Sequence, residues 1–337
     1  MGKRIGKQTV RLEHPVGILA SASIAGQKEK DGPLGSDFDV IMADAEWNEE
    51  TWEKTESKMQ KEAVRLAIQK AGLALSDMHY IFAGDLLNQC IGAGFGLREL
   101  HIPYFGIYGA CSTMIEGLSL ASMLIDGGFA DHAVAVTSSH FCTAERQYRM
   151  PLEYGGQRTP TAQWTVTGSG AAVLGKTVDV PHITHITTGK IMDMGVKDAN
   201  NMGGAMAPAA FDTLLTHFQD TGLSPADYDL ILTGDLGTVG RDVLIDLMQN
   251  EGFDITDNYN DGGCMIYDLD TQDVHAGGSG CGCIASVLCG HILPAMQRGE
   301  FRRILAIGTG ALLSTTSGLQ GESVPGIAHL VAISGKE

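Results

Sequence analysis

A cysteine stands in a turn of small residues, Gly109 to Gly117, between an apolar strand predicted over Ile102 to Tyr108 and an amphipathic helix predicted to end near Gly127. A thiol at a helix start lies at the positive end of the helix dipole, which lowers a cysteine pKa and attracts anions. Cys111 is therefore a candidate nucleophile or part of an anion pocket, with Ser112 beside it. The alternative is a small buried side chain at a tight packing point.

A second copy of this pattern favours the chemical interpretation. Shifting the chain by 172 residues places Cys111 on Cys283, and shifting it by 150 places Asp85 on Asp235. The two aspartates end predicted strands in Gly-Asp-Leu sequences, within segments that share seven of sixteen residues. Duplication is the simplest explanation. The sequence therefore predicts two similar halves, residues 1–178 and 179–337.

Composition limits the function. The chain has 337 residues, 44% of them hydrophobic, and a formal charge of −17 from 40 acidic and 23 basic residues. This charge argues against nucleic acid as a partner and against direct adsorption to an anionic membrane. No apolar run is long enough for a membrane span, no signal peptide is evident, and the seven cysteines have neither disulfide nor zinc spacing. We therefore expect a cytoplasmic protein without a thiolate-bound metal.

Apolar strands alternate with amphipathic helices in both halves, which indicates largely parallel sheets covered by helices. The connection from 140 to 163 contains His140, Arg146 and Arg158. Loops of this length are usually functional or contact other subunits. The sequence predicts strands at 16–26, 80–86, 102–108, 133–137, 164–175, 182–191, 230–235, 303–314 and 326–334, and further helices at 46–72, 207–222 and 241–252.

The motifs resemble the thiolase superfamily, nearest its ketoacyl synthase III branch. The resemblance rests on the duplicated order of elements, Ala110-Cys111-Ser112 at a helix start, the strand Ala133 to Thr137 and the run Gly168 to Leu174. It implies a five-layered α/β/α/β/α fold built from two duplicated halves, a dimer and an active cysteine at Cys111.

The same resemblance implies that His and Asn, or two His, assist the cysteine. This sequence has Gly234-Asp235 and Ser279-Gly280 at those positions, and His275 is either a loop residue or a shifted base. A cysteine without these partners loses the main contributions to acyl transfer. The sequence therefore predicts a retained pocket with no catalytic residues.

A closer resemblance covers nearly the whole chain. The turn Gly109 to Met114, the segment Gln157 to Gly168, the run Ala276 to Cys283 and the paired Gly-Asp-Leu sequences are similar to the stage V sporulation protein AD family of Bacilli and Clostridia. That family implies a homodimer that binds dipicolinate (pyridine-2,6-dicarboxylate), free or as its calcium chelate. It also implies work with membrane partners encoded in the same operon to load the spore core. Composition and spacing do not by themselves indicate this ligand.

The resemblance thus implies a dipicolinate site, and the residues expected in it lie in or near the motifs described above. Helix starts supply N–H groups to an anion, and arginine pairs with carboxylates. Asp85 and Asp235 either donate to calcium carried by the ligand or cap helices, and Arg158 contacts either the ligand or the dimer partner. The expected ligand-binding residues are Cys111, Ser112, Asp85, His140, Arg158, Asp235, Ser279, Cys281 and Cys283.

Further expectations concern activity, partners and location. The alternative function is acyl transfer from a thioester through Cys111. We expect no cofactor or resident metal, with calcium present only in the chelate, and no nucleic acid partner. The family resemblance places the strand 102–108 near the axis of a homodimer. It also places the protein in the cytoplasm of the sporulating cell, attached peripherally to the inner spore membrane through its partners.

Overall fold

A computed structural model describes residues 3–148 and 158–336 of the chain. Besides short 3₁₀ turns, the elements of the first half are β1 (Thr9–Ala25), α1 (Gln27–Lys30), β2 (Val40–Ile41), α2 (Trp52–Lys70), β3 (Tyr80–Gly84), α3 (Ile91–Leu97), β4 (Tyr104–Gly106), α4 (Thr113–Asp126), β5 (His132–Ser139), α5 (Phe141–Tyr148), β6 (Trp164–Thr165) and β7 (Gly168–Gly175). Those of the second half are β8 (His182–Thr187), α6 (Met202–Thr221), β9 (Leu230–Thr233), α7 (Gly237–Asn250), β10 (Tyr259–Asp261), α8 (Gly262–Met265), β11 (Gly278–Ser279), α9 (Cys281–Ser286), the π-helical turn Val287–Ile292, α10 (Leu293–Arg298), β12 (Arg303–Ala311), α11 (Thr315–Leu319) and β13 (Gly326–Ser334).

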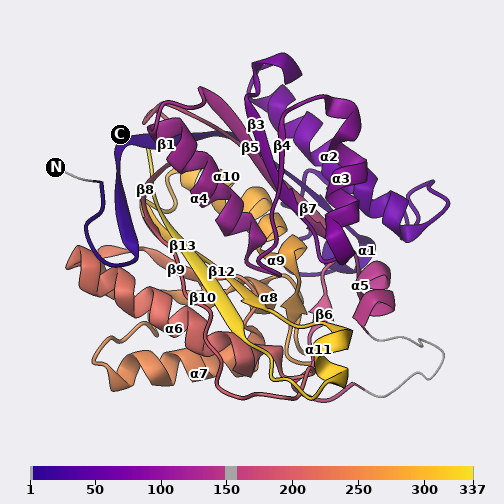
Figure 1. The fold of residues 1–337 in the computed structure, drawn as a ribbon, viewed down its shortest axis with the longest axis vertical. Helices are drawn as coiled ribbons and strands as arrows, with labels where there is room; N and C mark the ends of the chain where they lie inside the picture. Colours follow the sequence, from indigo (N-terminus) through magenta and orange to yellow (C-terminus); the bar gives the residue numbers. More distant parts are fainter. Residues whose placement is uncertain (1–2, 149–157, 337) are drawn as a thin grey trace.

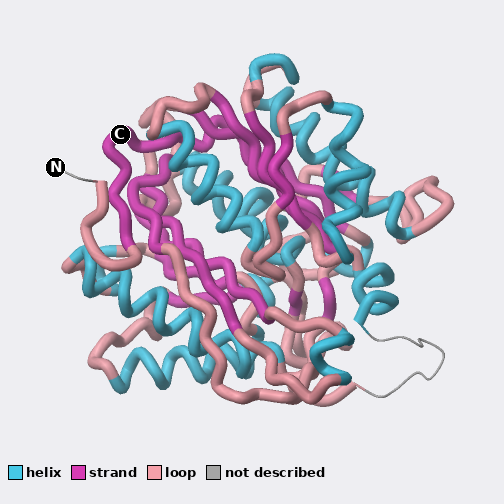
Figure 2. The backbone as a smooth tube through the Cα atoms, in the orientation of Figure 1, coloured by secondary structure: helices cyan, strands magenta, loops and turns pink. Residues whose placement is uncertain are grey.

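The elements stack in five layers, as the thiolase resemblance implies. Helices α2 and α3 cover the outer face of the first half of the sheet, α4 and α9 lie between its two halves, and α6 and α7 cover the outer face of the second half (Figure 1). Figure 2 shows the strands as two bands with helices between them. The central helix α4 is buried because strands of both halves of the sheet contact it, and Met114, Ile115 and Leu118 are fully buried.

The two halves of the sheet have matching strand orders. The first half reads β4-β3-β5-β7-β1 and the second β10-β9-β12-β13-β8, and antiparallel pairing of β1 with β8 joins them. In each half one strand, β3 or β9, has a parallel neighbour on both sides. The strand after this parallel set, β7 or β13, is antiparallel to it. The duplicated architecture predicted from the sequence is therefore present in the fold.

The central helices are equivalent between the halves. A shift of 172 residues lays Asp126, the last residue of α4, on Arg298, the last residue of α10. Cys111 lies two residues before α4, and Cys283 is the third residue of α9. Both cysteines thus lie within one turn of a helix start. Close packing under α9 needs small residues, because a Cβ on Gly170 would lie 2.2 Å from the Ala285 carbonyl oxygen.

Several predicted boundaries are wrong. The expected strand 102–108 is only the three-residue β4, which is exposed at the sheet edge. The strand 164–175 is divided, because β6 leaves the main sheet and pairs with β11. The connection 140–163 begins with α5, and the rest of that expectation lies partly outside the described residues. The helix predicted at 46–72 begins only at Trp52, where Thr51 caps it.

The division predicted at residue 178 falls in the connection between β7 and β8. The halves share the central helical layer, and their separation into two domains stays a prediction. Within the described ranges, none of the helices has the length and apolar character needed to cross a membrane.

Candidate functional site

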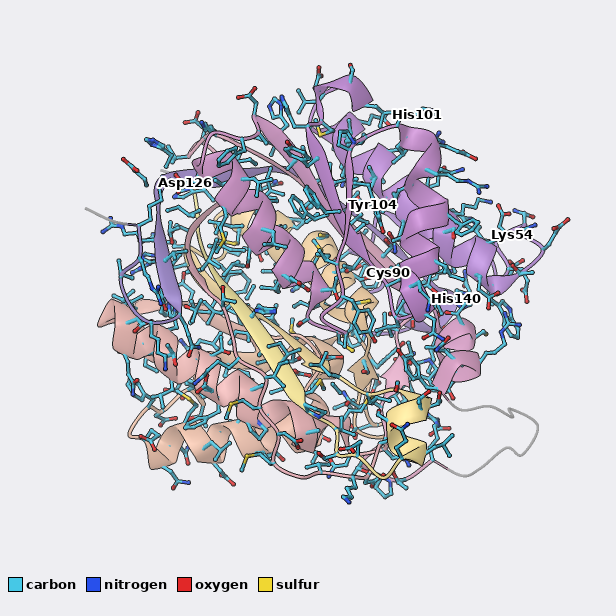
Figure 3. All side chains as sticks on the ribbon, in the orientation of Figure 1. Lys54, Cys90, His101, Tyr104, Asp126 and His140 are labelled. Carbon is cyan, nitrogen blue, oxygen red and sulfur yellow. The ribbon has the colours of Figure 1, made fainter. Side chains whose placement is uncertain are left out.

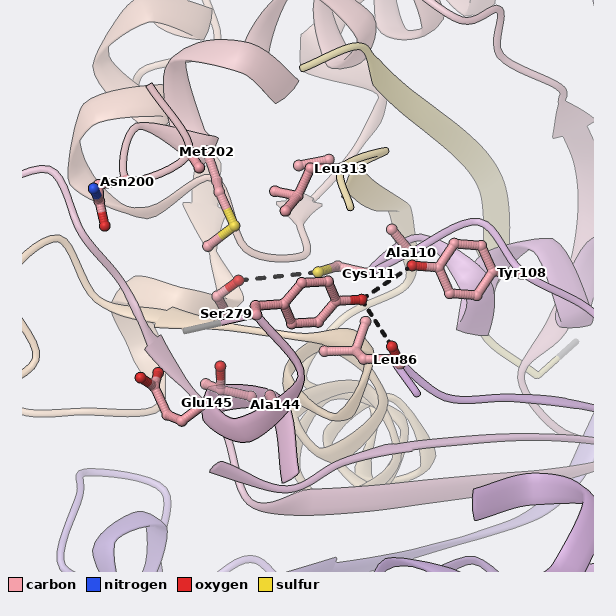
Figure 4. A pocket seen from close by; sticks show the side chains of 14 residues that line it. Leu86, Tyr108, Ala110, Cys111, Ala144, Glu145, Asn200, Met202, Ser279 and Leu313 are labelled. Atoms are coloured by element: carbon pink, nitrogen blue, oxygen red, sulfur yellow. Dashed lines mark hydrogen bonds between the residues drawn. The ribbon is translucent and has the colours of Figure 1, made fainter. Parts of the chain in front are cut away.

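Cys111 faces a cavity of about 250 Å³ at the carboxyl ends of strands, where Leu86 follows β3 and Ala311 ends β12. This is the end where open α/β sheets usually bind ligands. The described residues that line the cavity are apolar, hydroxylic, amide or acidic, and none of them is a histidine, lysine or arginine. Figure 4 shows Cys111 and Ser279 on one wall, with Asn200 and Met202 opposite Leu86.

The turn before α4 sets the position of the thiol. Ala110 has a φ of 50°, a left-handed conformation that is unfavourable for a residue with a Cβ. Hydrogen bonds from the Ser112 and Thr113 hydroxyls to the carbonyls of Gly109 and Ala110, at 2.7 and 2.6 Å, hold this turn. The strain is therefore maintained by local bonds, and it turns Cys111 towards the cavity at the start of α4.

A buried carboxylate lies behind the thiol. The Cys111 sulfur is 3.9 Å from the Ser279 hydroxyl oxygen, and that hydroxyl donates to Asp235 Oδ2 at 3.0 Å. The Gly280 N–H donates to the same oxygen at 2.9 Å, and the Thr309 hydroxyl donates to Oδ1 at 2.7 Å. Burial raises the pKa of Asp235 to about 6 against the opposing effect of these bonds. The group is thus an acceptor fixed in place by its donors.

Electrostatics keep the thiol protonated. Burial raises the pKa of Cys111 well above its ordinary value, and the charge of Asp235 and the hydrogen bond to it add to this. A cysteine acts as a nucleophile through its thiolate. The helix dipole that the sequence suggested as an activator is therefore outweighed in this pocket.

Two tyrosines close another side of the cavity. The Tyr148 hydroxyl donates to the Leu86 carbonyl at 2.7 Å and lies 3.3 Å from the Tyr108 hydroxyl (Figure 4). Burial raises the pKa of both phenols, so each remains a neutral donor near neutral pH. Glu145 and Asn200 contribute further polar groups. The cavity offers hydroxyl, amide and carboxylate oxygens to a ligand.

Three predicted site residues lie near the cavity without lining it. Ser112 is fully buried and holds the turn. The Cys281 thiol donates to the Ser138 carbonyl at 2.9 Å, and the Cys283 thiol approaches the Gly234 carbonyl at 3.5 Å. Burial raises the pKa of both thiols. Of the nine predicted ligand residues, the structure brings Cys111 and Ser279 to the cavity wall, with Asp235 directly behind them.

The two paired aspartates have different surroundings. Asp85 accepts hydrogen bonds from the N–H groups of Leu87 and Ala93, at 2.8 and 2.7 Å, so it caps the first turn of α3. Asp235 does not cap α7, because Asp261 accepts from the N–H groups that begin that helix. The helix-capping alternative therefore describes Asp85 and not Asp235.

His140 and Arg158 lie away from the Cys111 cavity. His140 is buried, hydrogen-bonds the Ala45 carbonyl at 2.9 Å and lines a separate hollow of about 190 Å³ (Figure 3). Arg158 forms an ion pair with Asp273 at 3.0 Å, and its guanidinium lies 4.6 Å from the centre of the Trp164 ring. His275 also pairs with Asp273, at 3.2 Å, and lies outside the lining.

Sequence reasoning missed part of the lining. Tyr108 ends the segment before the cysteine turn, and Tyr148 and Glu145 lie on α5, which was predicted as loop. An amphipathic pattern over 141–148 could have indicated this helix. Asn200 precedes α6 in a loop, and no sequence signal marked it.

Solved structures place this architecture in a class. OleA from Xanthomonas campestris matches with a TM-score of 0.63 at 15% identity, over 96% of this chain and 99% of that chain. The 3-oxoacyl-[acyl-carrier-protein] synthase III from Aquifex aeolicus VF5 matches with a TM-score of 0.58 at 14% identity, over 95% of this chain and 99% of that one. At these identities the likeness shows the fold alone. The chain has the thiolase-like fold of the ketoacyl synthase III type.

Sequence comparison is more specific. The sequence model of stage V sporulation protein AD matches residues 6–334. Stage V sporulation protein AD of Bacillus subtilis (strain 168) is 47% identical over 327 residues, which are 97% of this chain and 96% of that protein. The chain therefore belongs to the stage V sporulation protein AD family, a family of sporulation proteins, and the resemblance stated from its motifs is confirmed.

Proposed function

We propose that this sporulation protein binds dipicolinate in the Cys111 cavity, chiefly as the calcium chelate, without transforming it. The observation that carries the proposal is the cavity itself. Its volume of about 250 Å³ is just below the ~300–1,000 Å³ typical of pockets for drug-sized ligands. It therefore suits one small molecule.

Charge favours the chelate over the free dianion. Dipicolinate carries two carboxylates, and the described lining has no basic side chain to receive them. Asp235, which lies directly behind Ser279, adds a buried acidic group. A dianion would have to leave water next to like charge, which is unfavourable. Bound calcium neutralises the ligand, and it still accepts oxygen donors such as Glu145 and the Asn200 amide.

The surroundings of the thiol support a binding role. Asp235 lies next to the position that a condensing enzyme would use to activate its cysteine, and its charge opposes formation of a thiolate. The described lining holds no histidine to accept the thiol proton. Acyl transfer needs both an activated nucleophile and stabilisation of the oxyanion. The protonated Cys111 instead serves as part of the wall.

Acyl transfer is the second candidate, because one observation favours it. Cys111 follows a strained residue at the start of a helix, in a fold shared with condensing enzymes. Iodoacetamide and acyl-CoA labelling separates the candidates. Stoichiometric acylation of Cys111 followed by turnover would support the enzyme, whereas slow alkylation without acylation supports the binding protein.

The protein would act with partners at a membrane. We place the protein in the cytoplasm of the sporulating cell, held at the inner spore membrane by membrane proteins encoded in the same operon. It acts as a homodimer joined along β4, where Tyr104 and Phe105 are 41% and 47% exposed at a sheet edge (Figure 3). Unpaired edge strands with exposed aromatic side chains favour association. Tyr108, beside this edge, also lines the cavity, so a second copy would adjoin the ligand site.

Calorimetric titration tests the function. The full-length chain is titrated with equimolar calcium and dipicolinate, with dipicolinate in EDTA, and with calcium alone. We expect saturable heat with the chelate and weak or no heat with the other two. Equal affinity for the free dianion would overturn the charge argument, and no binding of either form would overturn dipicolinate as the ligand.

A further inference from the structure

A wide groove lies at the opposite end of the sheet from the Cys111 cavity. Its volume is about 990 Å³, roughly four times that of the cavity. Strand β12 connects the two places, because Arg303 at its start lines the groove and Ala311 at its end lines the cavity. Eight residues of strand span roughly 26 Å. The groove is therefore separate from the proposed ligand site.

An irregularity in β1 forms one wall of the groove. Arg11 pairs with His185 and Val16 pairs with Ile183. Between these two pairs β1 has four residues, whereas β8 has only one. The extra residues, including Glu13 and Pro15, bulge beside the pairing strands and line the groove.

The N-terminal segment forms another wall. It folds back on β1 through the Arg4–Val10 bridge, and Lys3 is held to Asp126, at 2.8 Å (Figure 3). Ile5 lies in the same wall and is 40% exposed.

Positive charge gathers in the groove although the whole chain is acidic. The described lining includes Lys3, Arg4, Arg11 and Arg303, against Glu13 as its single acidic residue. The chain as a whole carries a formal charge of −17. A positive patch on a strongly acidic protein is not explained by the net charge of the chain. It therefore indicates a binding surface for a negatively charged partner.

Two of these cations form no close ion pair. Among the described residues, neither Arg11 nor Arg303 forms a salt bridge. Arg303 lies 5.3 Å from the centre of the Tyr228 ring and interacts electrostatically, at longer range, with the exposed Asp227. His185 lies between the two arginines in the sheet and is neutral, because burial, then the charges of Arg11 and Arg303, lower its pKa to about 4. An incoming carboxylate would gain charged hydrogen bonds from the two guanidinium groups.

We propose that this groove binds an acidic segment of a partner protein, with carboxylates on Arg11 and Arg303 and apolar side chains on Ile5. The groove is longer than one small anion needs, and its concave shape does not match a flat membrane. Nucleic acid would meet the strongly negative remainder of the surface. The inference does not depend on dipicolinate as the ligand of the other site.

The experiment uses the full chain and a short fluorescein-labelled peptide in which glutamate alternates with leucine, followed by fluorescence anisotropy. We expect saturable binding that weakens with salt. Arg11→Glu and Arg11→Glu/Arg303→Glu should weaken it, the double variant by about tenfold or more. The control Lys54→Glu/Arg65→Glu makes the same charge change on α2, where both side chains are exposed (Figure 3 labels Lys54), and should change affinity less than about twofold.

Each other result overturns the proposal. Equal loss in the control pair would show that the peptide senses only net charge. Displacement of the peptide by free dipicolinate would assign the groove to a small anion. Flotation with phosphatidylglycerol vesicles through Arg11, without peptide binding, would assign it to lipid. A change in sedimentation of the double variant in the absence of peptide would assign it to a second copy of the chain.

Discussion

The Cys111 sulfur and the Ser279 hydroxyl lie 3.9 Å apart although 168 residues separate them. Each residue comes from the segment before a central helix, one in each half of the duplicated fold. Gly280 makes this approach possible, since its φ of 106° suits glycine and an added Cβ would lie 2.5 Å from the Ser139 hydroxyl. The site is thus assembled where the two halves meet.

Replacement of Cys111 by alanine should weaken binding of the calcium chelate and leave the fold intact. Loss of one small buried side chain costs on the order of 1 kcal/mol of unfolding free energy. The control is Cys289→Ala, which removes the same atoms from the core away from the cavity. Calorimetric titration and thermal unfolding compare the variants. Unchanged binding in Cys111→Ala would place the ligand elsewhere, and a cysteine-dependent thioester turnover would restore the enzyme interpretation.

Tyr148→Phe should lower both stability and ligand affinity. It removes the donor to the buried Leu86 carbonyl, which then loses a 2.7 Å hydrogen bond. Such an unpaired group costs about 1–3 kcal/mol. Tyr80→Phe is the matched control, because its half-buried ring packs on Phe105 away from the cavity. Denaturant unfolding gives the difference, and equal stability of the two variants would contradict this role for the hydroxyl.

Glu56 should make the protein less stable as the pH rises. Burial, then the charge of Asp85, raises the pKa of Glu56 to about 8 from its ordinary value of 4.5. Between these values the unfolded chain releases the proton and the folded chain keeps it, so the free energy of unfolding falls as pH increases. Below pH 4.5 Glu56 is protonated in both the folded and the unfolded chain, so its ionisation does not reduce the free energy of unfolding. Above about pH 8 it is ionised in both, and the free energy of unfolding falls no further on its account.

Glu56→Gln tests this dependence because glutamine does not ionise. Relative to the wild type, the variant should gain stability between pH 5 and pH 8, as measured by calorimetric melting temperatures across that range. A constant difference at all pH values would show that Glu56 is ionised in the folded state.

Phe105→Asp should convert a dimer into a monomer. The side chain is 47% exposed on the edge strand β4, and it stacks on Phe82 with ring centres 5.1 Å apart. A charge there would be buried against a second copy. Phe129→Asp is the control, since Phe129 is 73% exposed after α4. Sedimentation velocity at micromolar concentration decides, and a wild-type monomer would refute the interface.

The fold could be predicted from the sequence because duplication and the alternation of strands with helices extend over the whole chain. The residues of the site could be predicted only in part. Cys111 was recognisable from the repeats and Ser279 from its place before the helix at Cys283, whereas Arg158 and His140 were selected for residue type and lie elsewhere. Tyr148 was missed because α5 is short and its position depends on tertiary packing. Asp85 and Asp235 look alike in sequence, and only their neighbours distinguish a helix cap from a support for the thiol.

The position of α4 between the two halves of the sheet also affects how the chain is made. Strands β12 and β13, which cover one face of α4, are the last strands of the chain. At roughly 5–20 residues per second, the roughly 160 residues from the end of β7 to the end of β13 take about 10–30 s to synthesise. During this interval an apolar helix face on the completed first half has no cover. The first half therefore exposes this helix face to solvent or to other proteins until β12 and β13 have been made, so the final packing of α4 cannot precede the end of synthesis.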